Sequence, residues 1–280
     1  MRHSERSGGR VGSPWTPQEA WRATATRAPG CHLFFDFDGT LAPIADDPSA
    51  VYPAPGVVAA IAELAGAVGH VAIVSARPVE FLRDRFADLP AAVDLYGLYG
   101  LQVHRAGQTH TDPTALDWAP AMAQLADRAR AELPGGDEVV EFKRLSVALH
   151  YRTTPELGER VEAWARAEAT RLGLRVQSGR MVVEVKPPGG RDKGTVIAEA
   201  VCEAACAWYF GDDLSDIKAF QSLRARAAAE PDFFGVCVAV ANPETGQELS
   251  AAADLTLASP AALADFLHGG AAELRRAPAA

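Results

Sequence analysis

The sequence predicts an α/β fold: a doubly wound, Rossmann-like parallel-sheet core that carries an inserted α+β cap domain. Three observations lead to this prediction. Short apolar runs alternate with segments of helical spacing over residues 31–99, two longer helical segments flank hairpin-like alternation over 117–186, and the first pattern returns from residue 193. Because strands that alternate with helices join through right-handed crossovers, the two outer segments are expected to share one parallel sheet. The middle segment is therefore an insertion.

In the first segment, each buried strand leads into a helix. Cys31–Phe35 is a short apolar run that ends in a charged turn, as buried parallel strands do. Pro55 suits the first turn of the next helix, because a proline there gives up no hydrogen bond. The predicted elements are strands at Cys31–Phe35, Val71–Val74 and Asp94–Tyr99, and helices at Pro55–Ala67 and Val79–Phe86.

In the middle segment, two helices accompany a mostly antiparallel sheet, and strand–helix alternation resumes after Pro187-Pro188-Gly189-Gly190. The predicted helices are Asp117–Leu133, Pro155–Leu172, Lys193–Cys206, Asp216–Ala229 and Ala261–Leu267. The predicted strands are Val139–Phe142, Ser146–Tyr151, Leu174–Ser178, Met181–Lys186, Ala207–Phe210, Val236–Val240 and Leu255–Leu257.

These segments divide the chain into three expected parts. Residues 1–27 are rich in Arg, Ser and Gly, hold little that could pack, and are expected to form a flexible leader. The core is expected at 28–112 and 188–280, and the α+β cap at 113–187.

Composition limits the kinds of protein that this chain can be. With 48% hydrophobic and 22% charged residues, it can bury a sizeable core. A net charge of −9 argues against a nucleic-acid partner, and no apolar run approaches the roughly 20 residues that a membrane-spanning helix needs. The four cysteines lie in apolar stretches without the cluster of a zinc site, as expected of reduced thiols in a cytoplasmic protein. We expect a monomer, with a weak dimer as the alternative.

Two carboxylates, Asp36 and Asp38, follow the first predicted strand in the stretch Phe34-Phe35-Asp36-Phe37-Asp38-Gly39-Thr40. Residues two apart share a face, so both side chains leave the sheet together at the end where open α/β folds bind ligands. Gly39 and Thr40 turn the chain sharply and are expected to present backbone N–H groups to an anion. The alternative is an Asp-rich turn that only caps the next element.

A carboxylate such as Asp36 can attack phosphorus and form an aspartyl-phosphate, provided that cations offset the charge of the phosphate. The sequence offers a divalent-cation site in Asp212, Asp213 and Asp216, which follow the strand at Ala207–Phe210. Oxygen ligands without a His or thiolate cluster suit Mg²⁺. The alternative is that these residues only cap the following helix.

Ser75 and Lys193 lie at two further strand or helix ends. Ser75 follows the strand Val71–Val74 and can offer its hydroxyl to a phosphate oxygen, although a serine there is often only a turn residue. Lys193 opens a helix after a Pro/Gly loop, and its ammonium can act as a point charge on phosphate. The alternative for Lys193 is a solvated surface lysine.

Asp36-x-Asp38-Gly39-Thr40, Ser75, Lys193 and the Asp212 cluster, in this order, resemble the four motifs of the haloacid dehalogenase superfamily. A finer resemblance, to the trehalose-6-phosphate phosphatase family, rests on three stretches: residues 36–48, 140–152 (Val-Glu-Phe-Lys-Arg-Leu-Ser-Val-Ala-Leu-His-Tyr-Arg) and 179–188. The resemblance runs from about residue 31 to the C-terminus and places the cap between the second and third motifs.

The resemblance implies hydrolysis of trehalose 6-phosphate, a small-molecule sugar phosphate, with Mg²⁺ as cofactor. Asp36 would be the nucleophile, and Asp38 would protonate the leaving oxygen and then activate water. The implied metal site comprises Asp36, the Asp38 backbone carbonyl and Asp212, with Asp213 or Asp216 in or near the shell. The phosphoryl group would be held by Gly39, Thr40, Ser75 and Lys193. The sugar hydroxyls would be held by Glu141, Lys143, Arg152, Arg180 and Glu184, unless these residues form only a solvated cap face.

The sequence departs from the family pattern in three places. Ala76 replaces the usual glycine of Ser-Gly-Arg, Ser215 and Ile217 replace a threonine and a glutamate after the acidic pair, and Phe142 and Arg144 flank the cap lysine. The loss of a carboxylate at Ile217 puts the second metal contact in question.

Five alternatives to trehalose 6-phosphate hydrolysis remain open. The same chemistry could act on sucrose phosphate, mannosylglycerate phosphate or an aminocyclitol phosphate. The fold would also suit a phosphomutase, or a degenerate domain that senses a sugar phosphate without turning it over; the intact Asp36 and Asp38 argue against the sensor.

Overall fold

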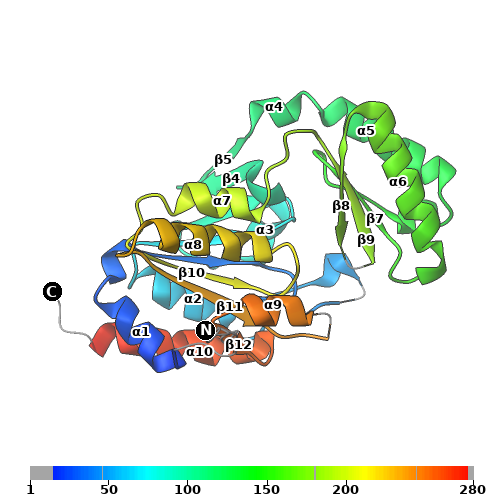
Figure 1. Ribbon diagram of the computed structural model, residues 1–280. Coiled ribbons are helices and arrows are strands. Elements are labelled where there is room, and N and C mark those ends of the chain that lie inside the picture. Colours follow the sequence, from blue (N-terminus) through cyan, green and yellow to red (C-terminus); the bar gives the residue numbers. More distant parts are fainter. Residues whose placement is uncertain (1–14, 46, 180, 244, 277–280) are drawn as a thin grey trace, which may run out of the picture.

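The computed structural model describes residues 15–45, 47–179, 181–243 and 245–276, which form two β-sheets (Figure 1). The strands of the larger sheet are, in chain order, β1 (Cys31–Phe35), β2 (His70–Val74), β3 (Val93–Gly97), β4 (Gln102–Arg105), β5 (Gln108–Thr111), β10 (Cys206–Gly211), β11 (Phe234–Val240) and β12 (Leu255–Leu257). Their spatial order is β12-β11-β10-β1-β2-β3-β4-β5. Pairing is parallel from β12 to β3, and β4 and β5 extend the sheet as an antiparallel hairpin.

Helices cover both faces of this sheet. The helices are α1 (Pro17–Ala25), α2 (Val57–Ala65), α3 (Val79–Arg85), α7 (Lys193–Ala200), α8 (Ile217–Ala229), α9 (Gln247–Ala252) and α10 (Pro260–Arg276). In Figure 1, α1, α2 and α10 lie under one face, and α7 and α8 lie over the other. Alternate residues of β1 supply both layers, because Leu33 and Phe35 join the first apolar cluster and Phe34 joins the second.

The smaller sheet lies between β5 and α7 in the chain and is antiparallel throughout. Its strands, in spatial order, are β6 (Val140–Phe142), β7 (Val147–His150), β9 (Val182–Lys186) and β8 (Arg175–Gly179). The helices of this part are α4 (Pro113–Leu116), α5 (Ala119–Glu132) and α6 (Gly158–Leu172). The predicted fold class, a doubly wound core with an inserted α+β cap, is confirmed.

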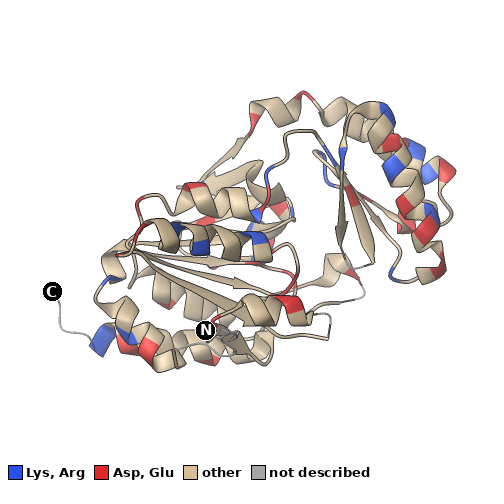
Figure 2. Cartoon of the chain, viewed as in Figure 1, with Lys and Arg blue, Asp and Glu red and all other residues tan. Residues whose placement is uncertain are grey.

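The two faces of the smaller sheet have different roles. Val147, Leu149 and Val183 pack against α5 and α6 in one apolar cluster. Because strand residues alternate, the polar side chains of Glu141 and Glu184 point to the other face, which meets the core. In Figure 2, acidic and basic residues are frequent along the outer helices α5 and α6.

The prediction of a flexible leader is wrong for residues 15–27, while residues 1–14 lie outside the described part of the chain. Helix α1 begins with a capping box between Thr16 and Glu19. Its Trp21 is only 2% exposed and stacks on Trp208 of β10 with ring centroids 4.1 Å apart. A Cβ on Gly270 of α10 would lie 2.3 Å from Trp21, so the absent side chain makes room for the indole. The helix is therefore part of the core.

Several predicted boundaries also differ from the structure. The hairpin β4–β5 was not predicted, because its polar, part-exposed residues lack an apolar run. The helix predicted over Lys193–Cys206 ends at Ala200, and Cys206 already begins β10. Cys202 is exposed, whereas the other three cysteines are buried. Among the described helices, none is long and apolar enough to cross a lipid bilayer.

Candidate active site

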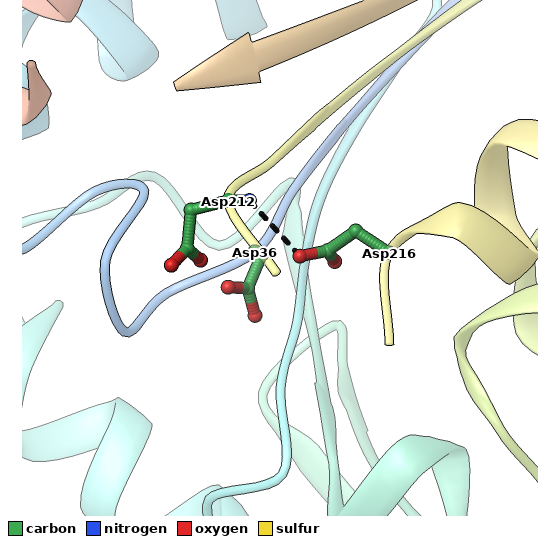
Figure 3. A group of neighbouring side chains, drawn as sticks. All are labelled: Asp36, Asp212 and Asp216. Atoms are coloured by element: carbon green, nitrogen blue, oxygen red, sulfur yellow. Dashed lines mark hydrogen bonds between the residues drawn. The ribbon is translucent and has the colours of Figure 1, made fainter. Parts of the chain in front are cut away.

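Three buried carboxylates meet at the carboxyl ends of β1 and β10 (Figure 3). The two strands are parallel neighbours with Phe35 opposite Phe210, so Asp36 and Asp212 emerge side by side. Asp216 comes from the turn that opens α8. One oxygen from each of the three carboxylates lies within 4.8 Å of the others. The sequence prediction that these residues converge is thus what the structure shows.

Lys193 reaches this cluster because of strand alternation. Asp36 lies two residues after Phe34 and so faces the side of the sheet that α7 covers. Lys193 is the first residue of α7, and the side chain of Asp192 caps the helix by accepting from the Thr195 amide. The Lys193 ammonium lies 2.7 Å from one oxygen of Asp36 and 2.7 Å from one oxygen of Asp216.

Asp216 has both oxygens committed to donors of the protein. One oxygen accepts from the Lys193 ammonium and from the Tyr209 hydroxyl, each at 2.7 Å. The other accepts from the backbone amides of Asp212 and Asp213, each at 3.0 Å. The side chain thereby fixes both the lysine and the loop that carries Asp212.

The acidic cluster carries more negative charge than Lys193 offsets. Burial raises the pKa of the Asp36 carboxyl well above its usual range, and Asp212 and Asp213 add to this against the pull of Lys193. Burial, with Asp216 and Asp213, likewise raises the pKa of Asp212. A cation bound between Asp36 and Asp212 would relieve this repulsion, and carboxylate oxygens are the ligands that hard divalent cations prefer. The residues present therefore fit a divalent cation.

The turn after β1 brings Thr40 between two of these carboxylates. Its hydroxyl lies 3.4 Å from an Asp36 oxygen and 3.2 Å from an Asp212 oxygen. Gly39 has φ of +81°, and a Cβ there would lie 2.1 Å from an Asp212 oxygen, so only glycine fits. The Gly39 amide donates to the Ala42 carbonyl at 2.8 Å, and the Thr40 amide to Phe37 at 3.3 Å. The predicted anion nest of free N–H groups at Gly39 and Thr40 is therefore wrong, because the turn itself uses these donors.

Asp213 and Asn242 stand at the edge of the cluster. The Asp213 side chain is 55% exposed, lies 4.0 Å from the Lys193 ammonium, and accepts from the amide and hydroxyl of Ser215. The Asn242 amide donates to Asp212 at 2.8 Å from the end of β11. It fixes the Asp212 oxygen that does not contact Thr40.

Asp38 lies at the mouth of the site, with its side chain 36% exposed. The guanidinium of Arg77 donates to its two oxygens, through Nε at 2.9 Å and Nη2 at 2.8 Å. Ser75 is almost fully buried after β2, and its hydroxyl accepts from the Arg77 amide at 3.1 Å. Arg77 thus contacts both Ser75 and Asp38, although no role was predicted for it from the sequence.

Three of the predicted cap residues form a charged cluster on the face of the small sheet that meets the core. The Lys143 ammonium lies 3.7 Å from Glu141 and 3.6 Å from Glu184. Burial alone would raise the pKa of Glu141. Lys143, His150 and Arg77 outweigh this effect and together lower the pKa to about 2. Burial alone would raise the pKa of Glu184, but Lys143, Lys186 and the hydrogen bond from Ser146 lower it by more. The pKa of Glu184 is therefore below its usual range. Both carboxyls are therefore anions at neutral pH.

Two core side chains reach these cap carboxylates. The Tyr99 hydroxyl donates to Glu184 at 3.3 Å, and an Arg77 nitrogen lies 3.6 Å from Glu141. A cavity of about 150 Å³ opens beside Glu184 between the two sheets, lined by Tyr99, Lys186 and the segment 187–191 among others.

Two further sugar-site residues, Arg152 and Arg180, were predicted from the sequence. Arg152 follows β7 and is half-buried. Arg180 lies outside the described residues.

Arg77, Tyr99, Tyr209 and Asn242 were missed by sequence reasoning. Two of them carried a usable signal, because Arg77 and Asn242 follow the buried strands β2 and β11 by three and two residues, much as Asp38 follows β1. Tyr99 adopts a left-handed conformation with φ of 57°, which no sequence pattern indicated.

Comparison with known proteins agrees with this architecture. A family model described as trehalose-phosphatase matches residues 34–258. Proteins named trehalose-phosphate phosphatase from Mycobacterium marinum and Mycolicibacterium paratuberculosis are 36% and 35% identical over 92% and 87% of this chain. The chain spans 65% and 63% of their lengths.

The fold is also found in a solved structure. The C-terminal domain of C. albicans trehalose-6-phosphate phosphatase superposes with a TM-score of 0.75 at 20% identity, covering 93% of this chain and 99% of that domain. At this identity the likeness concerns the fold. The family match and the mycobacterial relatives confirm the resemblance drawn from the motifs: the chain belongs to the trehalose-phosphatase family.

Proposed function

We propose that this chain is a Mg²⁺-dependent phosphatase that hydrolyses trehalose 6-phosphate to trehalose and phosphate through an aspartyl-phosphate on Asp36. The observation that carries the proposal is the placement of the Asp36 carboxylate, 2.7 Å from the Lys193 ammonium and beside Asp212 at a strand end. A buried carboxylate next to both an ammonium and a second carboxylate suits a nucleophile better than a helix cap.

In the first step, an Asp36 oxygen forms a bond to phosphorus and the bond from phosphorus to the sugar oxygen breaks. The leaving oxygen takes the proton of the Asp38 carboxyl. In the second step, Asp38 takes a proton from water as the water oxygen attacks phosphorus, and the bond to Asp36 breaks to give phosphate. Asp38 ends the cycle protonated, as it began.

Lys193 and Ser75 would hold the phosphoryl oxygens, because an ammonium and a hydroxyl supply the charge and the donor that the transferring group needs. Asp36, Asp212 and the Asp38 backbone carbonyl would hold Mg²⁺, with Asp213 near its shell. When bound, the ion supplies positive charge that offsets the repulsion between the phosphate and the carboxylates. Asp216, whose oxygens are all engaged, would hold Lys193 instead of binding the metal.

The cap would supply the specificity for the sugar. Glu141, Lys143 and Glu184 present charged donors and acceptors that suit the hydroxyls of a disaccharide, and a buried group left unpaired by a wrong sugar would lower its rate. The names of the mycobacterial relatives support trehalose 6-phosphate as the substrate. Arg152 and Arg180 remain predicted sugar contacts.

The test is a phosphate-release assay with Mg²⁺ across trehalose 6-phosphate, sucrose 6-phosphate, mannosylglycerate phosphate and glucose 6-phosphate. We expect trehalose 6-phosphate to have the highest kcat/KM and chelation of Mg²⁺ to abolish turnover. Equal rates with glucose 6-phosphate would overturn the substrate assignment. Asp36→Asn is the matched control for the mechanism, and near-wild-type turnover in this variant would overturn the covalent route.

A further inference from the structure

Arg77 contacts carboxylates of both parts of the molecule. Its Nε and Nη2 donate to Asp38 of the core, and its Nη1 lies 3.6 Å from an oxygen of Glu141 in the cap. The side chain is 10% exposed. One guanidinium is thus shared between the proposed acid–base residue and a proposed sugar residue.

The surroundings of Arg77 hold this guanidinium in place. It stacks on the ring of Phe81 with its central carbon 4.6 Å from the centroid. Its backbone amide donates to the Ser75 hydroxyl at 3.1 Å, and its carbonyl accepts from the Leu98 amide at 2.9 Å. Since the backbone and the side chain of Arg77 are both fixed, the two donors Nε and Nη2 point in a fixed direction. We call this pair of donors the fork.

Two parallel N–H···O bonds to one carboxylate restrain its rotation, which a single ammonium cannot do. Asp38 is otherwise at the exposed mouth of the site, where a carboxylate would rotate freely. Its orientation toward a leaving oxygen therefore depends on Arg77.

We propose that Arg77 is a positioning residue that aims Asp38 at the leaving oxygen and links this orientation to the cap through Glu141. The proposal rests on the proposed function, in which Asp38 transfers the proton. Glu141 lies beside the third guanidinium nitrogen, Nη1, so the cap carboxylate and Asp38 restrain the same planar group. Each Asp38 oxygen accepts one of the two bonds from Arg77 and keeps a second lone pair, which holds the transferred proton on the side of the leaving group.

Leaving-group dependence tests this proposal. A sugar alkoxide needs a proton as it leaves, whereas the phenolate of 4-nitrophenyl phosphate does not, and kcat/KM reports only the steps through phosphoryl transfer. A residue that positions the proton donor must therefore affect the sugar phosphate more than the aryl phosphate. We expect Arg77→Gln to lower kcat/KM for the sugar phosphate by about 100-fold and for the aryl phosphate by less than about fivefold.

Arg77→Lys separates the effect of the two hydrogen bonds to Asp38 from the effect of the positive charge. The lysine keeps the positive charge and the fold but cannot bridge both oxygens, so we expect the ratio of the two kcat/KM values to fall by at least about tenfold. Full recovery of the wild-type ratio in this variant would overturn the role of the fork. Equal loss on both substrates in Arg77→Gln and Arg77→Lys would show a purely structural role.

Arg85 provides the matched control. It stacks on the same Phe81 ring at 4.5 Å and is 9% exposed. Its hydrogen bonds within the described part of the chain go to the carbonyls of Val51 and Ser49 and to Asp84, and not to Asp38. Arg85→Gln therefore removes a similar buried cation without touching the acid–base residue. We expect the ratio of its kcat/KM for the sugar phosphate to its kcat/KM for the aryl phosphate to stay within about twofold of wild type.

Glu141→Gln tests the link to the cap. If Glu141 acts on Asp38 through Arg77, the ratio falls in the single variant, and the double variant with Arg77→Gln is no worse than Arg77→Gln alone. Additive losses would overturn the link. The ratio can be measured with any alkyl phosphate that the enzyme turns over, so failure of trehalose 6-phosphate as substrate would leave the test of Arg77 intact.

Discussion

Asp216→Asn discriminates between a metal ligand and a residue that holds Lys193. The Asp216 side chain is fully buried, and its oxygens accept from an ammonium, a hydroxyl and two backbone amides. Asparagine has nearly the same shape but only one acceptor oxygen. Its NH₂ would face either two backbone N–H groups or the Lys193 ammonium, so two donors would point at each other whichever way the amide lies.

The expected loss of stability follows from these contacts. Removing one partner of a buried, hydrogen-bonded charge pair costs about 3–5 kcal/mol, because the remaining charge stays buried with less compensation. We expect chemical denaturation of the metal-free protein to show a decrease of that size in the free energy of unfolding. Since Lys193 would lose one of its two carboxylates, we also expect kcat to fall by about 100-fold.

The Mg²⁺ dependence of the rate is the decisive measurement. We expect Asp216→Asn to change the half-saturating Mg²⁺ concentration by less than about threefold, whereas Asp212→Asn raises it by about tenfold or more. A shift in Asp216→Asn as large as that in Asp212→Asn would refute the reasoning, because Asp216 would then bind the metal.

Three further predictions concern stability and the geometry of the turn. Trp21→Ala should lower the free energy of unfolding by about 3–5 kcal/mol, and an unchanged denaturation midpoint would show that α1 is not docked. Burial lowers the pKa of His70 and of His32 below their usual range, so the unfolded chain binds protons first as pH falls below about 6.5, and stability should fall there. His70→Gln should flatten that slope in thermal melts between pH 7 and about 5. Gly39→Ala should reduce kcat/KM by about 100-fold and raise the Mg²⁺ requirement with little loss of secondary structure by circular dichroism, since its Cβ would displace Asp212.

Strand periodicity explains why so much of the core site could be predicted. Asp36, Ser75 and Asp212 each follow a short, buried strand, and parallel strands deliver their carboxyl ends to one edge of the sheet. Lys193 was predicted from its place at a helix start after a Pro/Gly loop. These inferences need only local sequence and the rule of parallel connection.

The features that escaped prediction depend on long-range packing. The contact between Arg77 and Glu141 joins residues of the core and the cap, and no local pattern fixes how the two sheets approach. The packing of Trp21 depends on the missing side chain of Gly270, far along the chain. Helix α1 did carry a local signal, the capping box of Thr16 and Glu19, which the polar composition of the preceding residues obscured.

The departures from the family pattern also have physical explanations. Ile217 packs with the apolar cluster under α7 and α8, and Asp212 is held by Thr40 and Asn242, so the acidic cluster forms without a carboxylate at position 217. Ala76 is not among the described residues with positive φ, so the turn after Ser75 accepts an alanine.

One electrostatic arrangement recurs through the core site and the cap: a single cation lies between two carboxylates. The three instances are Lys193 between Asp36 and Asp216, Arg77 between Asp38 and Glu141, and Lys143 between Glu141 and Glu184. Because Glu141 is shared by Arg77 and Lys143, the five carboxylates exceed the three cations by two charges when all are ionised, and this excess would repel a phosphate dianion. Under the proposed function, this excess of negative charge is the physical reason for a divalent cation, and we expect the cation to bind before the phosphate. It also means that each cation is held from two sides, which fixes the Lys193 ammonium beside Asp36 and the Arg77 guanidinium beside Asp38.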